Sequence, residues 1–369
     1  MSDSDQAGKK SKFRKFTKYS FIGLGSIVVL FIALAICGYL AFFRFHGDVE
    51  KIFFESGEVT MSGLFVKPEG AGPFPVVILL HGSGRLPGDG PPVRRMANAF
   101  LKEGIGFLSY DKRGVGSSGG TFRHNAYDEF IEDGNNAVRY LKSRDDVNHE
   151  AIGLLGSSEG GWLAPKIAAD TNSVAFIVSR AGPAVSWIDT NQWELRHLLI
   201  DAGLTGEFLE DAVRVRGNAF RFLLKAEADP SLVDSEGWCQ IDSEIAAFDQ
   251  TYGKNEVWLN QARRYGQKLA DWENFYKSLT PAIRYDPQPY IEQLDIPMLY
   301  IYAENDRNVP TADCVEYLEG LQERSHPNIE FDVIPGVGHT MMSLAAVLEG
   351  GYDPAFITVI GPWAAEKIK

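Results

Sequence analysis

The hydrophobic pattern of the chain begins with one long apolar run and continues as shorter segments. Residues 19–43 (YSFIGLGSIVVLFIALAICGYLAFF) contain no charged side chain. As a helix these 25 residues would extend about 37 Å, which is enough to cross the hydrocarbon core of a bilayer with some tilt. Beyond residue 43 the apolar segments are short and are separated by polar or glycine-rich ones, as in a globular domain.

The long apolar run is predicted to be an uncleaved membrane anchor. The apolar region of a secretory signal is usually about 7–15 residues long, so the run exceeds it. A processed signal or lipoprotein is one alternative, because residues 34–37 (LAIC) resemble a lipoprotein cleavage box, although Ile36 is bulky where a small residue is expected. A buried core helix is the other alternative.

Charges flanking the run predict its orientation. Residues 1–18 hold six Lys or Arg side chains against Asp3 and Asp5, whereas the flank after the run is mixed. The positive-inside rule then places the basic tail, residues 1–18, in the cytoplasm. The folded body is expected outside the cytoplasm, which would be the periplasm of a Gram-negative bacterium.

After the run the pattern predicts strands that alternate with helices. Two strands, residues 52–56 and 59–66, come first, and the apolar run at 76–80 is typical of a strand buried on both faces. Strand–helix alternation of this kind indicates a mainly parallel sheet with helices on both faces. The further strands are predicted at residues 105–110, 151–155, 174–179, 298–302 and 329–334, and the helices at 94–103, 126–142, 162–169, 312–322 and within 354–368.

The alternation is interrupted once. Residues 185–285 show helical periodicity and no convincing strand. The simplest organisation is one α/β domain, built from residues 44–184 and 286–369, with residues 185–285 inserted as a helical cap over the sheet. The insertion is rich in aromatic residues, most of which we expect to form the core of the cap, with a minority lining an apolar pocket below it.

Composition narrows the possible functions. The net charge is −13 and the first 18 residues are basic, so the rest of the chain is strongly acidic and nucleic acid is an unfavourable partner. Three cysteines do not make a disulfide framework. The sequence has no CxxC or HExxH motif and no GxxxxGK[ST] loop, so we expect neither a metal nor another cofactor.

A G-x-S-x-G motif at residues 156–160 (GSSEG) carries the main chemical signal. Its central residue, Ser158, follows the apolar segment AIGLL and precedes the apolar segment WLAPKIAA. A strand-to-helix turn of this kind lifts a serine hydroxyl above a sheet. A second match, residues 116–120, has Ser118 at its centre, but seven residues of loop separate Ser118 from its strand and no helix follows directly. Ser158 is therefore the candidate nucleophile.

A second motif, His81-Gly82-Ser83-Gly84, follows the predicted strand VVILL. With the motif around Ser158, it makes residues 52–369, apart from the cap, resemble the α/β-hydrolase superfamily. The resemblance implies an oxyanion hole formed by the backbone N–H groups of Ser83, Gly84 and Glu159. It also implies a nucleophile, acid and histidine in that chain order.

Position in the predicted sheet selects the other two residues. Of seven histidines only His326 and His339 come late enough, and only His339 follows the strand at 329–334 on the edge where active sites collect. Asp306 comes just after the strand at 298–302 and is the preferred acid, with Glu304 as the alternative. Other late acids lie before a strand, within a strand or in the first turn of a helix: Asp295, Asp332 and Asp313.

Residues 110–117 (YDKRGVGS) resemble the D-x-R-G-x-G-x-S loop of bacterial esterases and proline-iminopeptidase-like enzymes. We interpret this loop as structural, with Asp111 and Arg113 bracing the site instead of reacting.

These features predict a serine hydrolase that cleaves carboxylic esters through an acyl-enzyme on Ser158. The expected partners are a small acyl substrate and, through residues 19–43, a lipid bilayer. A thioesterase or serine aminopeptidase would use the same three residues, and an acyltransferase would exclude water. A non-catalytic, membrane-tethered binding protein of the same fold is the alternative from another class.

Overall fold

The computed structural model describes residues 26–36, 44–229, 231–232, 236–253, 255, 282–324, 326–343 and 351–369. The chain divides into two compact units, Met1–Arg44 and Phe45–Lys369.

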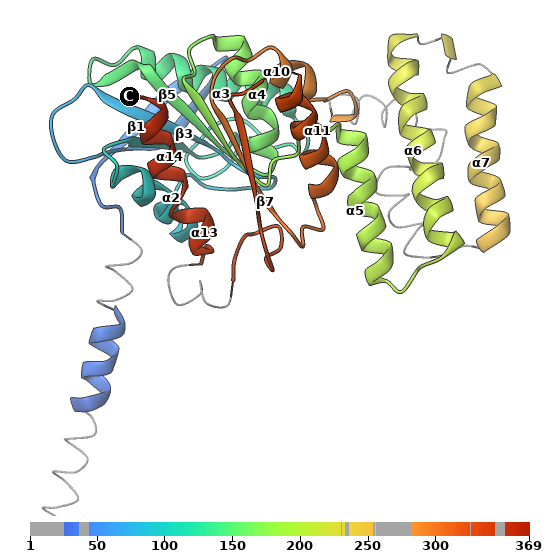
Figure 1. Ribbon diagram of the computed structural model, residues 1–369, viewed down its shortest axis with the longest axis horizontal. Coiled ribbons are helices and arrows are strands. Elements are labelled where there is room, and N and C mark those ends of the chain that lie inside the picture. The colour runs from blue at the N-terminus through green and yellow to red at the C-terminus, as the bar shows by residue number, and fades with distance from the viewer. Residues whose placement is uncertain are drawn as a thin grey trace, which may run out of the picture. The chain divides into compact units, whose positions relative to one another are not determined.

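An eight-stranded sheet forms the centre of the second unit (Figure 1). Its strand order is β1-β2-β4-β3-β5-β6-β7-β8. The β1–β2 and β2–β4 pairs are antiparallel, and all other neighbours are parallel. The strands are β1 (Asp48–Ser56), β2 (Val59–Lys67), β3 (Phe74–Leu80), β4 (Gly106–Tyr110), β5 (Val147–Ser157), β6 (Phe176–Arg180), β7 (Met298–Ala303) and β8 (Ile329–Ile334).

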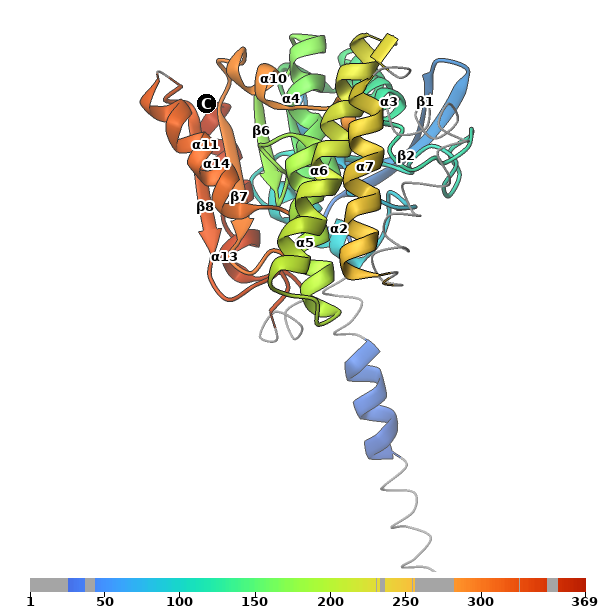
Figure 2. The same ribbon diagram turned by 90° about the vertical axis from the view of Figure 1, so that its right-hand side faces the viewer.

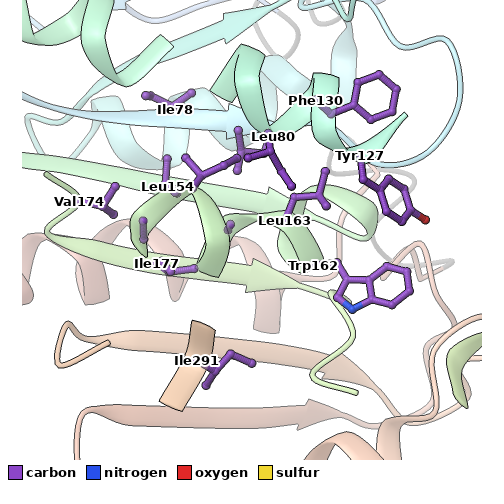
Figure 3. Packing of buried hydrophobic residues seen from close by; sticks show 14 of the residues in the cluster. Ile78, Leu80, Tyr127, Phe130, Leu154, Trp162, Leu163, Val174, Ile177 and Ile291 are labelled. Atoms are coloured by element: carbon purple, nitrogen blue, oxygen red, sulfur yellow. The ribbon is translucent and has the colours of Figure 1, made fainter. Parts of the chain in front are cut away.

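Helices cover both faces of the sheet, which explains why β3, in the middle of the sheet, is apolar at every position. In β3 the side chains of Ile78 and Leu80 enter one core and those of Val77 and Leu79 the other, as the two-residue period of a strand requires. Figure 3 shows Ile78 and Leu80 packing in the first core with residues of a covering helix. This core contains residues of α3 (Tyr127–Lys142), α4 (Glu159–Thr171), α10 (Gln288–Glu292) and α11 (Thr311–Glu323), and the second contains residues of α2 (Pro91–Leu101), α13 (Pro354–Ile357) and α14 (Ile360–Lys367).

The described part of residues 185–285 is helical and contains no strand. It consists mainly of α5 (Trp187–Asp201), α6 (Glu207–Ala228) and α7 (Glu236–Tyr252), which lie side by side in Figure 2. The hydroxyl of Ser186 caps α5 by accepting the N–H of Asp189. The three helices share a small core of their own, which includes Leu199, Leu209 and Phe248. Residues 256–281, also part of the predicted cap, lie outside the described residues.

The predicted membrane anchor falls mainly outside the described residues. Its described part, residues 26–36, is a helix whose large apolar side chains, such as Phe31 at 69% exposure, are exposed. Among the helices that the structure describes, none combines the length and the apolarity needed to span a bilayer. The transmembrane helix at residues 19–43 and the basic tail at residues 1–18 therefore stay predictions.

Candidate active site

Ser158 stands at a sharp turn between the end of β5 and the start of α4. Its backbone has φ 52° and ψ −116°, a conformation that residues other than glycine rarely adopt. The N–H of Ser158 donates to the carbonyl of Arg180, at the end of the neighbouring strand β6, at 2.7 Å. The strained turn is thus held by the sheet and projects the Ser158 side chain beyond the strand ends.

Two glycines of the motif allow backbone segments to crowd around this turn. A Cβ atom on Gly160 would lie 2.0 Å from the carbonyl oxygen of Leu80 in β3, and one on Gly156 would lie 2.3 Å from the Cα of Gly161. Real Cβ atoms do not approach so closely, so the first turn of α4 packs against β3 and β5 only without side chains here.

His339 and Asp306 lie beside Ser158. The Nε2 of His339 is 2.9 Å from the Oγ of Ser158, and its Nδ1 is 2.8 Å and 3.1 Å from the two carboxylate oxygens of Asp306. Since Nδ1 faces a carboxylate, it carries the proton and leaves Nε2 to accept one from the serine. One chain of hydrogen bonds thereby joins three separate segments of the sequence. Ser158 and Asp306 alone lie more than 140 positions apart.

Backbone hydrogen bonds hold the Asp306 carboxylate in place, in addition to its contact with the imidazole. Its side chain is fully buried, and its Oδ1 accepts the backbone N–H groups of Asn308 at 2.8 Å and Val309 at 2.9 Å. The alternative acid, Glu304, is exposed and instead accepts the N–H of Gly336 at 2.8 Å. Of these two acids, only Asp306 holds His339.

The other candidates occupy structural positions. The hydroxyl of Ser118 accepts the N–H of Ser62 at 2.9 Å and donates to the carbonyl of Asp111 at 2.7 Å, so it is committed within its loop. His326 precedes β8 and therefore lies at the opposite end of that strand from His339.

The predicted oxyanion residues differ in position. Ser83 and Glu159 line the same pocket as Ser158, whereas Gly84 is not among its lining residues. The loop that carries Ser83 packs on the turn, because a Cβ on Gly82 would lie 3.5 Å from the Cβ of Ser158. The N–H of Glu159 opens α4, at the end of the helix where the dipole favours negative charge.

Lys112 is a site residue that the sequence analysis missed. Its buried ammonium group donates to the carboxylate of Glu159 at 2.6 Å and to the carbonyl of Gly82 at 3.0 Å. It thus ties together the two loops that bear the Ser83 and Glu159 N–H groups. A lysine in the D-K-R-G segment and a glutamate directly after the candidate nucleophile are complementary charges, which was the available signal.

Asp111 and Arg113, the neighbours of Lys112, act further from the turn. Asp111 accepts the N–H groups of Gly88 at 2.7 Å and Ser117 at 2.8 Å. Arg113 forms a buried ion pair with Asp133 of α3 at 2.6 Å. Both residues therefore brace the fold. The residue of this loop that contacts the site is Lys112, through Gly82 and Glu159.

Arg180 is the second missed residue. Its guanidinium, buried at the end of β6, donates to the Oγ of Ser157 from Nε at 3.1 Å and to the carbonyl of His339 at 3.0 Å. Burial lowers the pKa of Arg180, while Tyr352 and Asp306 oppose that shift. One side chain therefore joins the turn of Ser158 to the loop of His339.

A pocket of about 170 Å³ opens beside Ser158. The cap supplies part of its wall through α5, and Trp193 of the same helix donates its indole N–H to the carbonyl of Asp306 at 3.1 Å. The sequence predicted an apolar pocket lined by a few aromatic residues of the cap. Trp187 of the cap does line the pocket, but polar residues share the lining. Its residues are Ser83, Asn125, Tyr127, Ser158, Glu159, Trp162, Pro183, Trp187, Thr190, Asn191, Glu194, Asn308 and Val309.

No group of three or more His, Cys, Asp or Glu side chains suited to a metal ion occurs in the part of the chain that the structure describes.

Comparison with known proteins identifies the family of the chain. Residues 77–348 match the sequence profile described as "Alpha/beta hydrolase family". The chain belongs to the alpha/beta hydrolase family. The predicted fold class, an α/β-hydrolase fold with a mostly parallel sheet, is therefore confirmed.

Among curated relatives, this hydrolase is similar to Esterase EstD of Thermotoga maritima, with 28% identity over 85% of the chain and 68% of the relative. It is also similar to Thiohydrolase aneE of Aspergillus aculeatus, with 32% identity over 74% of the chain and 83% of the relative. Both relatives are hydrolases by name, which agrees with the family of this chain.

Among solved structures, the hydrolase resembles the Pyrococcus furiosus esterase Pf2001, with a TM-score of 0.52, 17% identity and coverage of 87% of this chain and 92% of the other. DcsB in complex with its substrate analogue gives a TM-score of 0.53 at 16% identity, with coverage of 87% and 99%. At these identities the likeness concerns the fold.

The His81 imidazole predicts a pH dependence of stability. Burial lowers its pKa to about 4 from 6.5, partly offset by its Nε2–H bond to the Tyr110 carbonyl at 2.7 Å. The unfolded chain therefore binds a proton below pH 6.5 that the folded protein does not bind until about pH 4. The stability from neutral His81 is complete above pH 6.5 and falls as the pH drops through that window, by about 2 kcal/mol between pH 7 and pH 5.

We expect His81→Gln to reduce this loss, as measured by urea unfolding at pH 7 and pH 5. The exposed His124→Gln serves as the matched control and should keep the wild-type pH dependence. An equal loss in wild type and His81→Gln would contradict the assignment.

Proposed function

We propose that this hydrolase cleaves carboxylic esters through an acyl-enzyme on Ser158, with His339 as general base and Asp306 as the acid that orients it. The observation that carries the proposal is the hydrogen-bonded chain from the Ser158 hydroxyl through both nitrogens of His339 to the buried Asp306 carboxylate. This is the arrangement that activates a serine hydroxyl, which is a weak nucleophile by itself.

In the first half of the reaction, the Ser158 oxygen attacks the ester carbonyl while His339 Nε2 takes the hydroxyl proton. The negative charge that develops on the carbonyl oxygen is stabilised by the N–H groups of Ser83 and Glu159, with Gly84 as the third predicted donor. Asp306 stabilises the imidazolium. Collapse of the intermediate breaks the bond to the alcohol, which leaves with the proton from His339.

In the second half, His339 deprotonates a water molecule that attacks the acyl group. The bond between the acyl carbon and Ser158 breaks, the acid is released, and the proton returns to Ser158. A thioester or a short peptide would pass through the same steps with a thiol or an amine as leaving group. EstD supports the ester and aneE, by its name a thiohydrolase, supports the thioester as the second candidate.

Replacement of the nucleophile tests this proposal. We expect Ser158→Ala to abolish labelling by a fluorophosphonate probe and to lower p-nitrophenyl ester turnover by at least about 10⁴-fold. Ser118→Ala, in the other G-x-S-x-G match, is the matched control and should still be labelled. Unchanged labelling of Ser158→Ala would refute the assignment of the nucleophile, and a wild-type protein that is never labelled would favour the non-catalytic binding protein.

Arg180 is proposed to be a positioning residue for the same reaction, because it holds the His339 carbonyl and the Ser157 hydroxyl together. Methionine would keep much of the side-chain volume but donate no hydrogen bond. We expect Arg180→Met to lower kcat for p-nitrophenyl acetate by about 10–100-fold with a smaller change in KM, because a displaced base affects the chemical step more than binding. If Arg180→Met lowered thermal stability but left kcat unchanged, the role of Arg180 would be purely structural and the proposal would be wrong.

For the N-terminal segment we propose a single membrane-spanning helix at residues 19–43, with the tail in the cytoplasm and the hydrolase outside it. The absence of charge over these 25 residues and the exposed apolar side chains of the helix at 26–36 support this proposal.

We expect the full chain to stay in the membrane fraction after alkaline carbonate extraction, and a chain that begins at residue 44 to be extracted. External protease should digest the hydrolase in spheroplasts if the orientation is correct. A Cys37→Ser variant separates the alternatives, since release from the membrane by this change alone would indicate a lipoprotein instead of an anchor.

A further inference from the structure

Strand β1 (Asp48–Ser56) forms one edge of the sheet, and β8 forms the opposite edge (Figure 2). It pairs with β2 alone, and the register with β2 runs without a break over all nine residues. Natural proteins usually shorten, bend or cover such edges, because free N–H and C=O groups can pair with a further strand. β1 therefore offers an unusually long row of backbone groups to a partner.

The hydrogen bonds of β2 show which residues of β1 face the free edge. The carbonyls of Thr60 and Ser62 in β2 accept N–H groups from the segment after β4, at 2.9 Å and 2.8 Å, so they point away from β1. Their partners in β1, Glu55 and Phe53, therefore form non-hydrogen-bonded pairs with β2 and turn their own N–H and C=O groups to the free edge. By the same alternation the backbone groups of Lys51 also face outward.

The side chains of these outward residues are exposed as well. Ile52 and Phe54 fill the first core, but none of the described residues of the second core comes from β1, so the other face of this strand is open. Phe53 is 53% exposed and Val49 45%. The Nζ of Lys51 lies 5.2 Å from the centroid of the Phe53 ring. An exposed aromatic ring thus stands in the middle of an unpaired backbone edge.

The order of side chains along this edge is complementary to itself when two copies run antiparallel. With Phe53 opposite Phe53 of a second copy, Lys51 of each copy lies opposite Glu55 of the other. The carboxylate of Glu55 is held beside the edge by the Thr60 hydroxyl at 2.9 Å and has further acceptor sites. Registers centred on Lys51 or on Glu55 would place like charges opposite each other, which is unfavourable. Charge therefore selects the register centred on Phe53.

We propose that β1 is a dimerisation edge, on which β1 of a second copy of this chain pairs antiparallel about a two-fold axis at Phe53. The contact would join the two sheets into one through about six backbone hydrogen bonds, an aromatic pair and two ion pairs. An unrelated strand would need its own match to this order of cation, aromatic ring and anion, whereas a second copy supplies it. The proposal does not rest on the esterase function, since none of the described residues that line the pocket beside Ser158 belongs to β1.

Charge reversal tests both the dimer and its register, with the full chain in a non-ionic detergent and sedimentation velocity as the measurement. One pair of strands is a small interface, so we expect a dimer with a Kd in the micromolar range. Lys51→Glu alone or Glu55→Lys alone places like charges opposite each other twice per dimer and should raise the Kd by about 10-fold or more. The double variant restores opposite charges and should return the Kd to near the wild-type value. Phe53→Asp, which sets two carboxylates against each other, should be monomeric where the wild type is a dimer.

Lys225→Glu, at an exposed position of α6 in the cap, changes the net charge as Lys51→Glu does and should keep the wild-type Kd. Circular dichroism checks that each variant folds. A wild type that stays monomeric up to about 100 μM would leave the β1 edge to another partner and overturn the inference. A dimer that the β1 variants do not weaken would lie on another surface and overturn it too, as would single variants whose loss the double variant does not restore.

Discussion

The strained backbone of Ser158 is the constraint on which the rest of the site depends. A serine at φ 52° is unfavourable by itself, and it persists because β5, β6 and the first turn of α4 fix the chain on both sides. The same turn requires Gly160 to lie against the backbone of β3. Close backbone packing and exposure of the hydroxyl are therefore two consequences of one turn.

Around this turn the protein uses buried charges as connectors between loops. Lys112 joins the Gly82 loop to Glu159, and Arg180 joins the turn to the loop of His339. Burying a charge is costly unless hydrogen bonds satisfy it, so each cation favours the one arrangement of loops in which its partners converge. We infer that these pairs contribute to the precision of the site more than to overall stability.

The cap is connected to the acid of the site as well as to the pocket. The indole N–H of Trp193 bonds to the Asp306 carbonyl, and Asp201 at the end of α5 pairs with Arg307 at 2.6 Å. The helix that contributes Thr190 to the pocket therefore also holds the loop that orients His339. A shift of α5 would change both substrate contacts and the position of the acid.

The sequence by itself determined the order of strands and helices and the residues able to carry the chemistry, because periodicity and motif spacing are local properties of the chain. It singled out Ser158, His339 and Asp306 by their position after predicted strands, since the carboxyl ends of parallel strands meet at one edge. The roles of Lys112 and Arg180 were decided only by the tertiary structure. Their meaning depends on partners distant in sequence, which cannot be read from a local pattern.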